Sequence, residues 1–105
     1  LVASRRTFGE TGPALFIACI GQAAQAAALR IARELRRRDL WCEVSYGSAV
    51  LRNQLKRADR AGARYVFIIG DEEIGSGRIK YKRLSDGGEG SVGADEYEAM
   101  AALIG

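Results

Sequence analysis

The sequence predicts an α/β fold with a parallel sheet at its core. Residues 14–20 and 64–69 are nearly unbroken apolar runs, as expected of strands that are covered on both faces. Residues 22–38 and 49–61 carry apolar side chains at helical spacing, and a further strand is predicted at 40–46 between them. The order strand, helix, strand, helix, strand predicts right-handed crossovers and three parallel strands.

The ends of the two predicted helices carry recognisable signals. Asp39 stands where a helix-ending glycine is usual, and aspartate tolerates the left-handed conformation better than most residues. Ser48 is a candidate N-cap for the second helix, because its hydroxyl can accept a bond from a free backbone N–H. Gly62 is expected to end that helix.

The pattern changes after the third predicted strand. Residues 71–74 are expected to form an acidic turn, and 77–84 alternate apolar and basic side chains as in a strand with one solvated face. The segment 85–88 is a strong turn signal, so 89–92 is predicted to return as a short antiparallel strand. A short helix is predicted at 95–104.

Length and composition indicate one small globular domain. The 105 residues are 48% apolar and 28% charged, and no apolar run is long enough to span a bilayer, so no membrane partner is expected. Residues 1–12 read as a linker and 13–105 as the domain, and the lack of an initiator Met suggests a piece of a longer protein. The net charge of +3 favours a polyanionic partner.

The residue types argue against catalysis within this chain. There is no histidine, and the two cysteines lie in apolar segments, which disfavours acid–base chemistry and a zinc site. Cys19 and Cys42 are expected to be buried free thiols, since a disulfide would require neighbouring strands with suitable geometry. The loop after the first strand has one glycine, Gly21, where a dinucleotide fingerprint needs three.

The second predicted helix carries most of the candidate binding residues. Arg52, Lys56 and Arg60 recur every four residues, on the face opposite Leu51 and Leu55. A solvated helix face would explain these charges as well as a binding surface would. Their mutual repulsion, however, is largely uncompensated within the helix, and a phosphate backbone is the anion that would balance it.

Three acids, Asp71, Glu72 and Glu73, follow the third strand at the edge where open α/β sheets place ligands. One interpretation is that Asp71 caps a turn and the other two are surface acids. The alternative is base readout, because carboxylates accept hydrogen bonds from base amino groups. The two interpretations remain open at this point.

The run from Leu51 to Glu73, LRNQLKRADRAGARYVFIIGDEE, resembles the anticodon-binding domain of histidine–tRNA ligases, which are class II aminoacyl-tRNA synthetases. That family carries a similar Leu-Lys-x-Gln-x-Lys-x-Ala-Asp-x-x-Gly-Ala run followed by an apolar strand, glycine and an acidic turn. Here Arg52 replaces the usual lysine. The resemblance extends over about residues 14–92, although Trp41, Cys42 and the glycine-rich segment 85–90 depart from the family pattern.

The resemblance implies a three-layer fold with a mixed, mostly parallel sheet of about five strands flanked by helices. It also implies a cytoplasmic, homodimeric parent enzyme whose separate catalytic domain uses ATP with Mg²⁺, while this domain needs no cofactor and binds no metal. The expected partner is the anticodon stem-loop of tRNA. Carried onto this sequence, the predicted RNA-contacting residues are Gln22, Arg52, Asn53, Lys56, Arg57, Arg60, Glu73 and Lys80.

Other functions remain open from the sequence. A protein-interaction or dimerisation module of the same fold would expose an apolar patch of several hundred Å². A small-ligand module would show a formed pocket at the strand ends. The glycine, threonine and proline enzymes carry related domains. In the leading hypothesis, Lys56→Ala weakens binding to all RNAs and Glu73→Gln alters the preference among anticodons.

Overall fold

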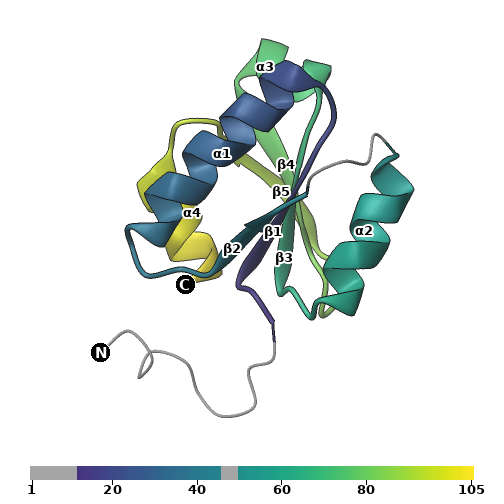
Figure 1. Ribbon diagram of the computed structural model, residues 1–105. Coiled ribbons are helices and arrows are strands. Elements are labelled where there is room, and N and C mark those ends of the chain that lie inside the picture. The colour runs from purple at the N-terminus through teal and green to yellow at the C-terminus, as the bar shows by residue number, and fades with distance from the viewer. Residues whose placement is uncertain (1–11, 46–49) are drawn as a thin grey trace.

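The computed structural model describes residues 12–45 and 50–105. Five strands form one sheet in the order β2-β1-β3-β4-β5 (Figure 1). The strands are β1 (Leu15–Cys19), β2 (Cys42–Val44), β3 (Tyr65–Ile69), β4 (Arg78–Arg83) and β5 (Glu89–Gly93). β1 pairs in parallel with β2 and β3, whereas β4 pairs antiparallel with β3 and β5. The predicted mixed sheet, with the first and third strands side by side, is confirmed.

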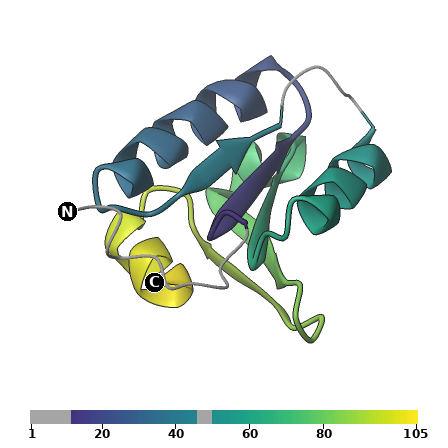
Figure 2. The same ribbon diagram turned by 60° about the horizontal axis from the view of Figure 1, so that its bottom comes forward.

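Helices cover the two faces of the sheet unequally. The helices are α1 (Gln22–Arg36), α2 (Leu51–Arg60), α3 (Asp71–Ser76) and α4 (Tyr97–Ile104). Figures 1 and 2 show α1 and α4 on one face and α2 on the other, which gives the predicted three layers. Within the described residues, no helix is long and apolar enough to cross a membrane.

The larger part of the core lies under α1 and α4. Every third or fourth side chain of α1 is buried, and Ile31 and Leu35 pack in the same cluster as Leu15 and Ile17 of β1. Each such buried aliphatic side chain stabilises the fold by about 1.5–3 kcal/mol. The helix ends two residues earlier than predicted, and Asp39 adopts the expected left-handed conformation, with φ of 65°.

The smaller part of the core lies under α2. Ala58 of α2 packs with Phe16 of β1 and Val66 of β3, and Leu55 packs against this cluster. On the α2 face, β4 therefore presents polar side chains instead of a helix-covered apolar surface. Lys82 stands opposite Val66 in the strand register and is half-buried. The candidate site lies on this face, where α2 leaves β4 uncovered.

The acidic segment after β3 differs from its prediction. Residues 71–74 were expected to form a turn, but they begin helix α3. The three acids lie in the first turn, where the helix dipole favours negative charge. The Glu73 carboxylate accepts from the Gly70 N–H, which is one half of a capping box, because glycine has no side chain to accept a bond in return. Gly77, with φ of 74°, ends the helix in the left-handed conformation.

The strand and helix boundaries otherwise agree with the predictions to within a few residues. Tyr46, Ser48 and Ala49 lie outside the described residues, as does the predicted linker up to residue 11, so the Ser48 cap stays a prediction.

Packing explains one glycine of the glycine-rich hairpin between β4 and β5. Gly90 stands opposite Tyr81, and a Cβ there would lie 2.5 Å from the Tyr81 hydroxyl oxygen.

Both cysteines are buried free thiols, as predicted. Cys42 pairs with Leu15 in the strand register, whereas Cys19 lies at the other end of β1, opposite Ile69. This separation along β1 excludes a disulfide between them, because bridged residues need close Cα atoms. Burial raises the pKa of the Cys42 thiol to about 12, and desolvation also raises the pKa of Cys19.

Candidate nucleic-acid interface

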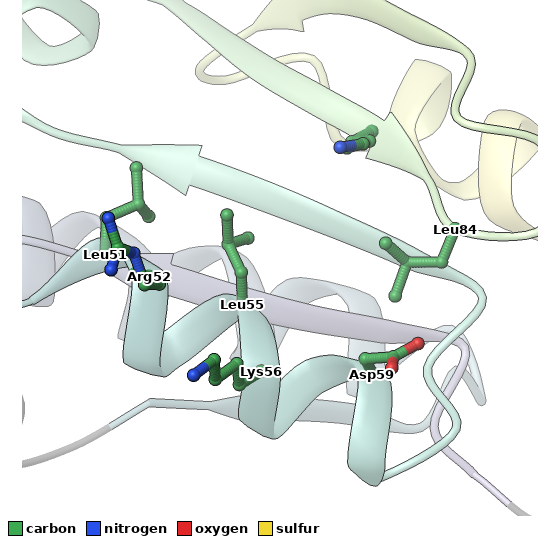
Figure 3. A pocket seen from close by; sticks show the side chains of 7 residues that line it. Leu51, Arg52, Leu55, Lys56, Asp59 and Leu84 are labelled. Carbon is green, nitrogen blue, oxygen red and sulfur yellow. The ribbon is translucent and has the colours of Figure 1, made fainter.

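A groove runs between α2 and the neighbouring strand β4 (Figure 3). Its volume is about 510 Å³, within the range of roughly 300–1,000 Å³ that is typical of small-ligand sites. Leu51 and Leu55 of α2 point toward the sheet, and Leu84 closes the same side at the end of β4. These three leucines, which we call the leucine floor, give the groove an apolar base.

Charged side chains surround the leucine floor. Arg52 and Lys56 line the groove from α2, and Lys82 lines it from β4. Asp59 is the one acid among the lining residues. Throughout residues 12–45 and 50–105, no ion pair includes any of these four charged groups. The groove therefore holds an uncompensated positive charge, which favours an anionic ligand.

A second hollow of about 310 Å³ lies on the uncovered part of the sheet. Lys82 lines both hollows, so the second one continues the basic surface along β4. Its other lining residues are Ile68, Lys80, Tyr81, Glu89 and Gly90. The structure thus joins the predicted basic faces of the second helix and the fourth strand into one surface.

The structure brings together some of the eight predicted contact residues and separates others. Arg52 and Lys56 line the groove, and Lys80 lines the adjoining hollow. The other α2 side chains in the set are exposed but do not line the groove; they are Asn53, Arg57 and Arg60. Gln22 is the exposed first residue of α1, and Glu73 lies in α3, so both follow strands at the carboxyl edge of the sheet.

Glu73 is already engaged within the fold. Its side chain is buried, with 7% of the residue exposed, and Oε1 accepts a 2.8 Å hydrogen bond from the Gly70 N–H. Its Oε2 lies 3.6 Å from Nζ of Lys80, which also lies 3.8 Å from a carboxylate oxygen of Glu72. Glu73 and Lys80 therefore already interact with each other in the absence of RNA.

Gln54 is a site-supporting residue that the sequence analysis missed. Gln54 is fully buried on the inner face of α2. Its Oε1 accepts a hydrogen bond from the Cys19 N–H at 2.9 Å, and its Nε2 donates one to the Cys19 carbonyl at 3.0 Å. This pair of bonds fixes α2 to the end of β1. A signal was present, because an amide among the inward-facing apolar positions of a helix requires a buried partner.

Lys82 and Asp59 were also missed as groove residues. Lys82 belongs to the segment 77–84, which was predicted to be a strand with one solvated face, and Asp59 is not among the predicted contact residues. Both lie in the groove because it opens between α2 and the end of β4, next to Leu84. Helical spacing alone does not show which strand a polar side chain will face.

Fold and site together define a small three-layer α/β module with a basic groove that has an apolar floor. Across residues 12–45 and 50–105, no group of three or more metal-binding side chains lies together. The chain belongs to the anticodon binding domain family, whose sequence profile matches residues 14–101. The family predicted from the run between Leu51 and Glu73 is therefore confirmed.

Curated relatives include histidine–tRNA ligases. The enzyme of Clostridium botulinum (strain Langeland) is 34% identical over 90 residues, which are 86% of this chain and 22% of that protein. The enzyme of Trichlorobacter lovleyi is 34% identical over all 105 residues of this chain, which correspond to 25% of that protein. The chain thus spans about a quarter of the length of these relatives.

Solved structures show the same architecture. The crystal structure of the apo histidyl-tRNA synthetase from S. aureus superposes with a TM-score of 0.81 and 25% identity, covering 95% of this chain and 28% of that one. The RNA binding domain of the threonyl-tRNA synthetase from Cryptosporidium parvum Iowa II reaches a TM-score of 0.74 at 16% identity, covering 92% of this chain and 26% of that one. The latter likeness shows the fold alone.

Proposed function

We propose that this chain is the module of a histidine–tRNA ligase that recognises the anticodon arm of tRNA. The observation that carries the proposal is the set of cations around the leucine floor, Arg52, Lys56 and Lys82, none of which forms an ion pair with another described residue. Cations attract the phosphates of a loop and set its register, while an apolar floor offers contact area to unstacked bases. Membership in the anticodon binding domain family and the names of the curated relatives support the same conclusion.

The remaining predicted contacts extend the proposed interface beyond the groove. Asn53, Arg57 and Arg60 are exposed on α2, and Gln22 is exposed at the edge where β1 ends. Lys80 extends the surface along β4. An anticodon loop that lies along α2 would meet these side chains on both sides of the groove. Glu73 stays a prediction as an RNA contact.

The chemistry of aminoacylation is proposed to take place elsewhere in the parent protein. This domain would act without a metal or cofactor of its own, and ATP with Mg²⁺ would bind in a separate catalytic domain of a cytoplasmic homodimer. The lack of histidine and the burial of both thiols support a binding role, since neither thiol is poised as a nucleophile.

The direct test compares hairpin RNAs that carry the histidine anticodon or a changed anticodon, each at two salt concentrations. We expect the 105-residue chain to prefer the histidine anticodon, and to keep this preference at the higher salt, because base contacts depend less on salt than phosphate contacts do. Preference for a glycine, threonine or proline anticodon would assign the domain to another enzyme. Equal binding that salt abolishes would contradict anticodon recognition.

We expect Lys56→Ala to weaken binding to all hairpins by a similar factor. Loss of one phosphate contact should reduce the slope of log affinity against log salt by roughly 0.7–1. Arg33→Ala is the matched control, because Arg33 is also an exposed helical cation but lies on α1, across the sheet from the groove. Equal effects of the two variants would show that net charge, not the groove, drives binding. Fluorescence anisotropy at four salt concentrations measures both slopes.

The interaction-module alternative gains no support from the exposed apolar residues. In the described part of the chain, the exposed large apolar side chains are Leu29, Val50 and Ile74. Val50 immediately precedes α2, on the opposite side of the sheet from Leu29 of α1. Side chains placed in this way do not form one patch of the size that a dimer interface requires.

A further inference from the structure

Asp59 occupies a position that the helix itself disfavours. It lies in the last turn of α2, where the partial negative charge of the helix C-terminus repels a carboxylate. Arg57 and Arg60 also lie in this turn, yet within the described residues no cation lies within ion-pair distance of the Asp59 carboxylate. Local stability therefore does not account for this acid.

The location of Asp59 suggests what its carboxylate can do. The side chain lies at the end of the groove facing Leu84 (Figure 3), and it lines the same groove as Arg52, Lys56 and Lys82. A ligand that satisfies the whole groove must combine an anionic group for the cations, an apolar ring for the leucine floor and a hydrogen-bond donor for the carboxylate. A nucleotide has these three features, and the groove volume is suited to one nucleotide.

We propose that the groove is a subsite for one unpaired nucleotide of the bound RNA, with Asp59 accepting a hydrogen bond from an exocyclic amino group of its base. The phosphates on either side of this nucleotide lie toward Arg52, Lys56 and Lys82, and the base ring lies on the leucine floor. A carboxylate only accepts hydrogen bonds. Adenine, cytosine and guanine each carry an exocyclic amino donor, whereas uracil and the base of inosine have none, so the subsite discriminates against uracil and inosine.

This subsite deepens the proposed function and rests on it. The proposal also assigns base readout to Asp59, whereas the hypothesis from the sequence assigned it to Glu73. Glu73 is buried and holds the Gly70 N–H, whereas Asp59 is exposed and faces the basic groove. Of these two acids, Asp59 is the one whose oxygens are accessible to a base.

The test measures the affinity of the 105-residue chain for a set of hairpin RNAs in which each loop base is replaced singly by uracil, or by inosine where the base is guanine. At one loop position, we expect loss of the amino group to weaken binding about 10-fold. Asp59→Ala should abolish this discrimination at that position only. Asp95→Ala, which removes an exposed carboxylate outside the groove, should keep it.

A second measurement detects contact with the leucine floor directly. The methyl NMR signals of Leu51, Leu55 and Leu84 should shift on addition of the hairpin, while those of Leu35, which is buried under α1, should not. Hairpin binding that leaves the three floor signals unchanged, or an Asp59→Ala variant with wild-type discrimination, would overturn the subsite and leave the proposed function standing. If the wild-type chain binds none of the hairpins, the proposed function itself fails.

Discussion

Gln54→Leu is expected to lower the free energy of unfolding by about 2–4 kcal/mol, because it leaves a buried peptide group without its partners. The Gln54 amide bonds both the N–H and the carbonyl of Cys19 at the end of β1, at 2.9 and 3.0 Å. Each buried group left unpaired costs about 1–3 kcal/mol, and the isosteric leucine avoids a large cavity. Urea denaturation measures the change.

The neighbouring variant Asn53→Leu is the matched control, since Asn53 is exposed on the same turn of α2. It should change the unfolding free energy by less than about 0.5 kcal/mol. If both leucine variants have the same stability, the Cys19 bonds do not fix α2 to the sheet, and the geometry of the groove must depend on the leucine packing alone.

For Gln54→Glu, we expect the free energy of unfolding to depend on pH in a defined direction. A carboxylate there can accept from the Cys19 N–H but cannot donate to the Cys19 carbonyl, whereas the protonated acid can do both. Burial and the facing carbonyl should raise the folded-state pKa of this glutamate above the unfolded value of about 4.3. The folded protein then binds more protons than the unfolded chain, so stability should rise as pH falls from 7 toward 5. Stability that is constant over this range would contradict the proposed geometry.

The fold was largely predictable because apolar periodicity determines which elements form and which faces they bury. The buried run of β1 and the helical spacing in α1 each specify one element with little ambiguity. The acidic segment was mispredicted as a turn, because the stabilising bond from the Gly70 N–H to Glu73 is a geometric feature that composition does not reveal. One half of a capping box, with glycine in place of serine or threonine at the N-cap, is hard to recognise in a sequence.

The candidate site was less predictable than the fold, because it depends on contacts between elements distant in the chain. Lys82 meets α2 only through the β3–β4 pairing, which places it opposite Val66. The roles of Asp59 and Glu73 depend on burial, since both are acids close to a basic helix in the sequence. Only the structure shows that the Asp59 carboxylate is exposed and that the Glu73 carboxylate is buried and bonded to the Gly70 N–H.

Glu73→Ala is expected to lower the free energy of unfolding by about 2 kcal/mol. The substitution removes the acceptor for the Gly70 N–H at the start of α3 and the ion pair with Lys80, whose Nζ lies 3.6 Å from the carboxylate. Glu72→Ala is the control, because Glu72 is highly exposed and its contact with Lys80 at 3.8 Å is a surface pair worth little. Thermal and urea denaturation should show a clear loss for Glu73→Ala alone.

Glu73→Gln then separates a supporting role from base readout. The amide oxygen can still accept from the Gly70 N–H, so α3 should remain capped, while the negative charge beside Lys80 is lost. Because the side chain is buried and points back to its own helix start, we expect binding to all anticodon hairpins to change by one common factor within about 3-fold. A selective change for one anticodon would instead show that Glu73 leaves its capping position and contacts a base, in which case RNA binding must remodel the start of α3.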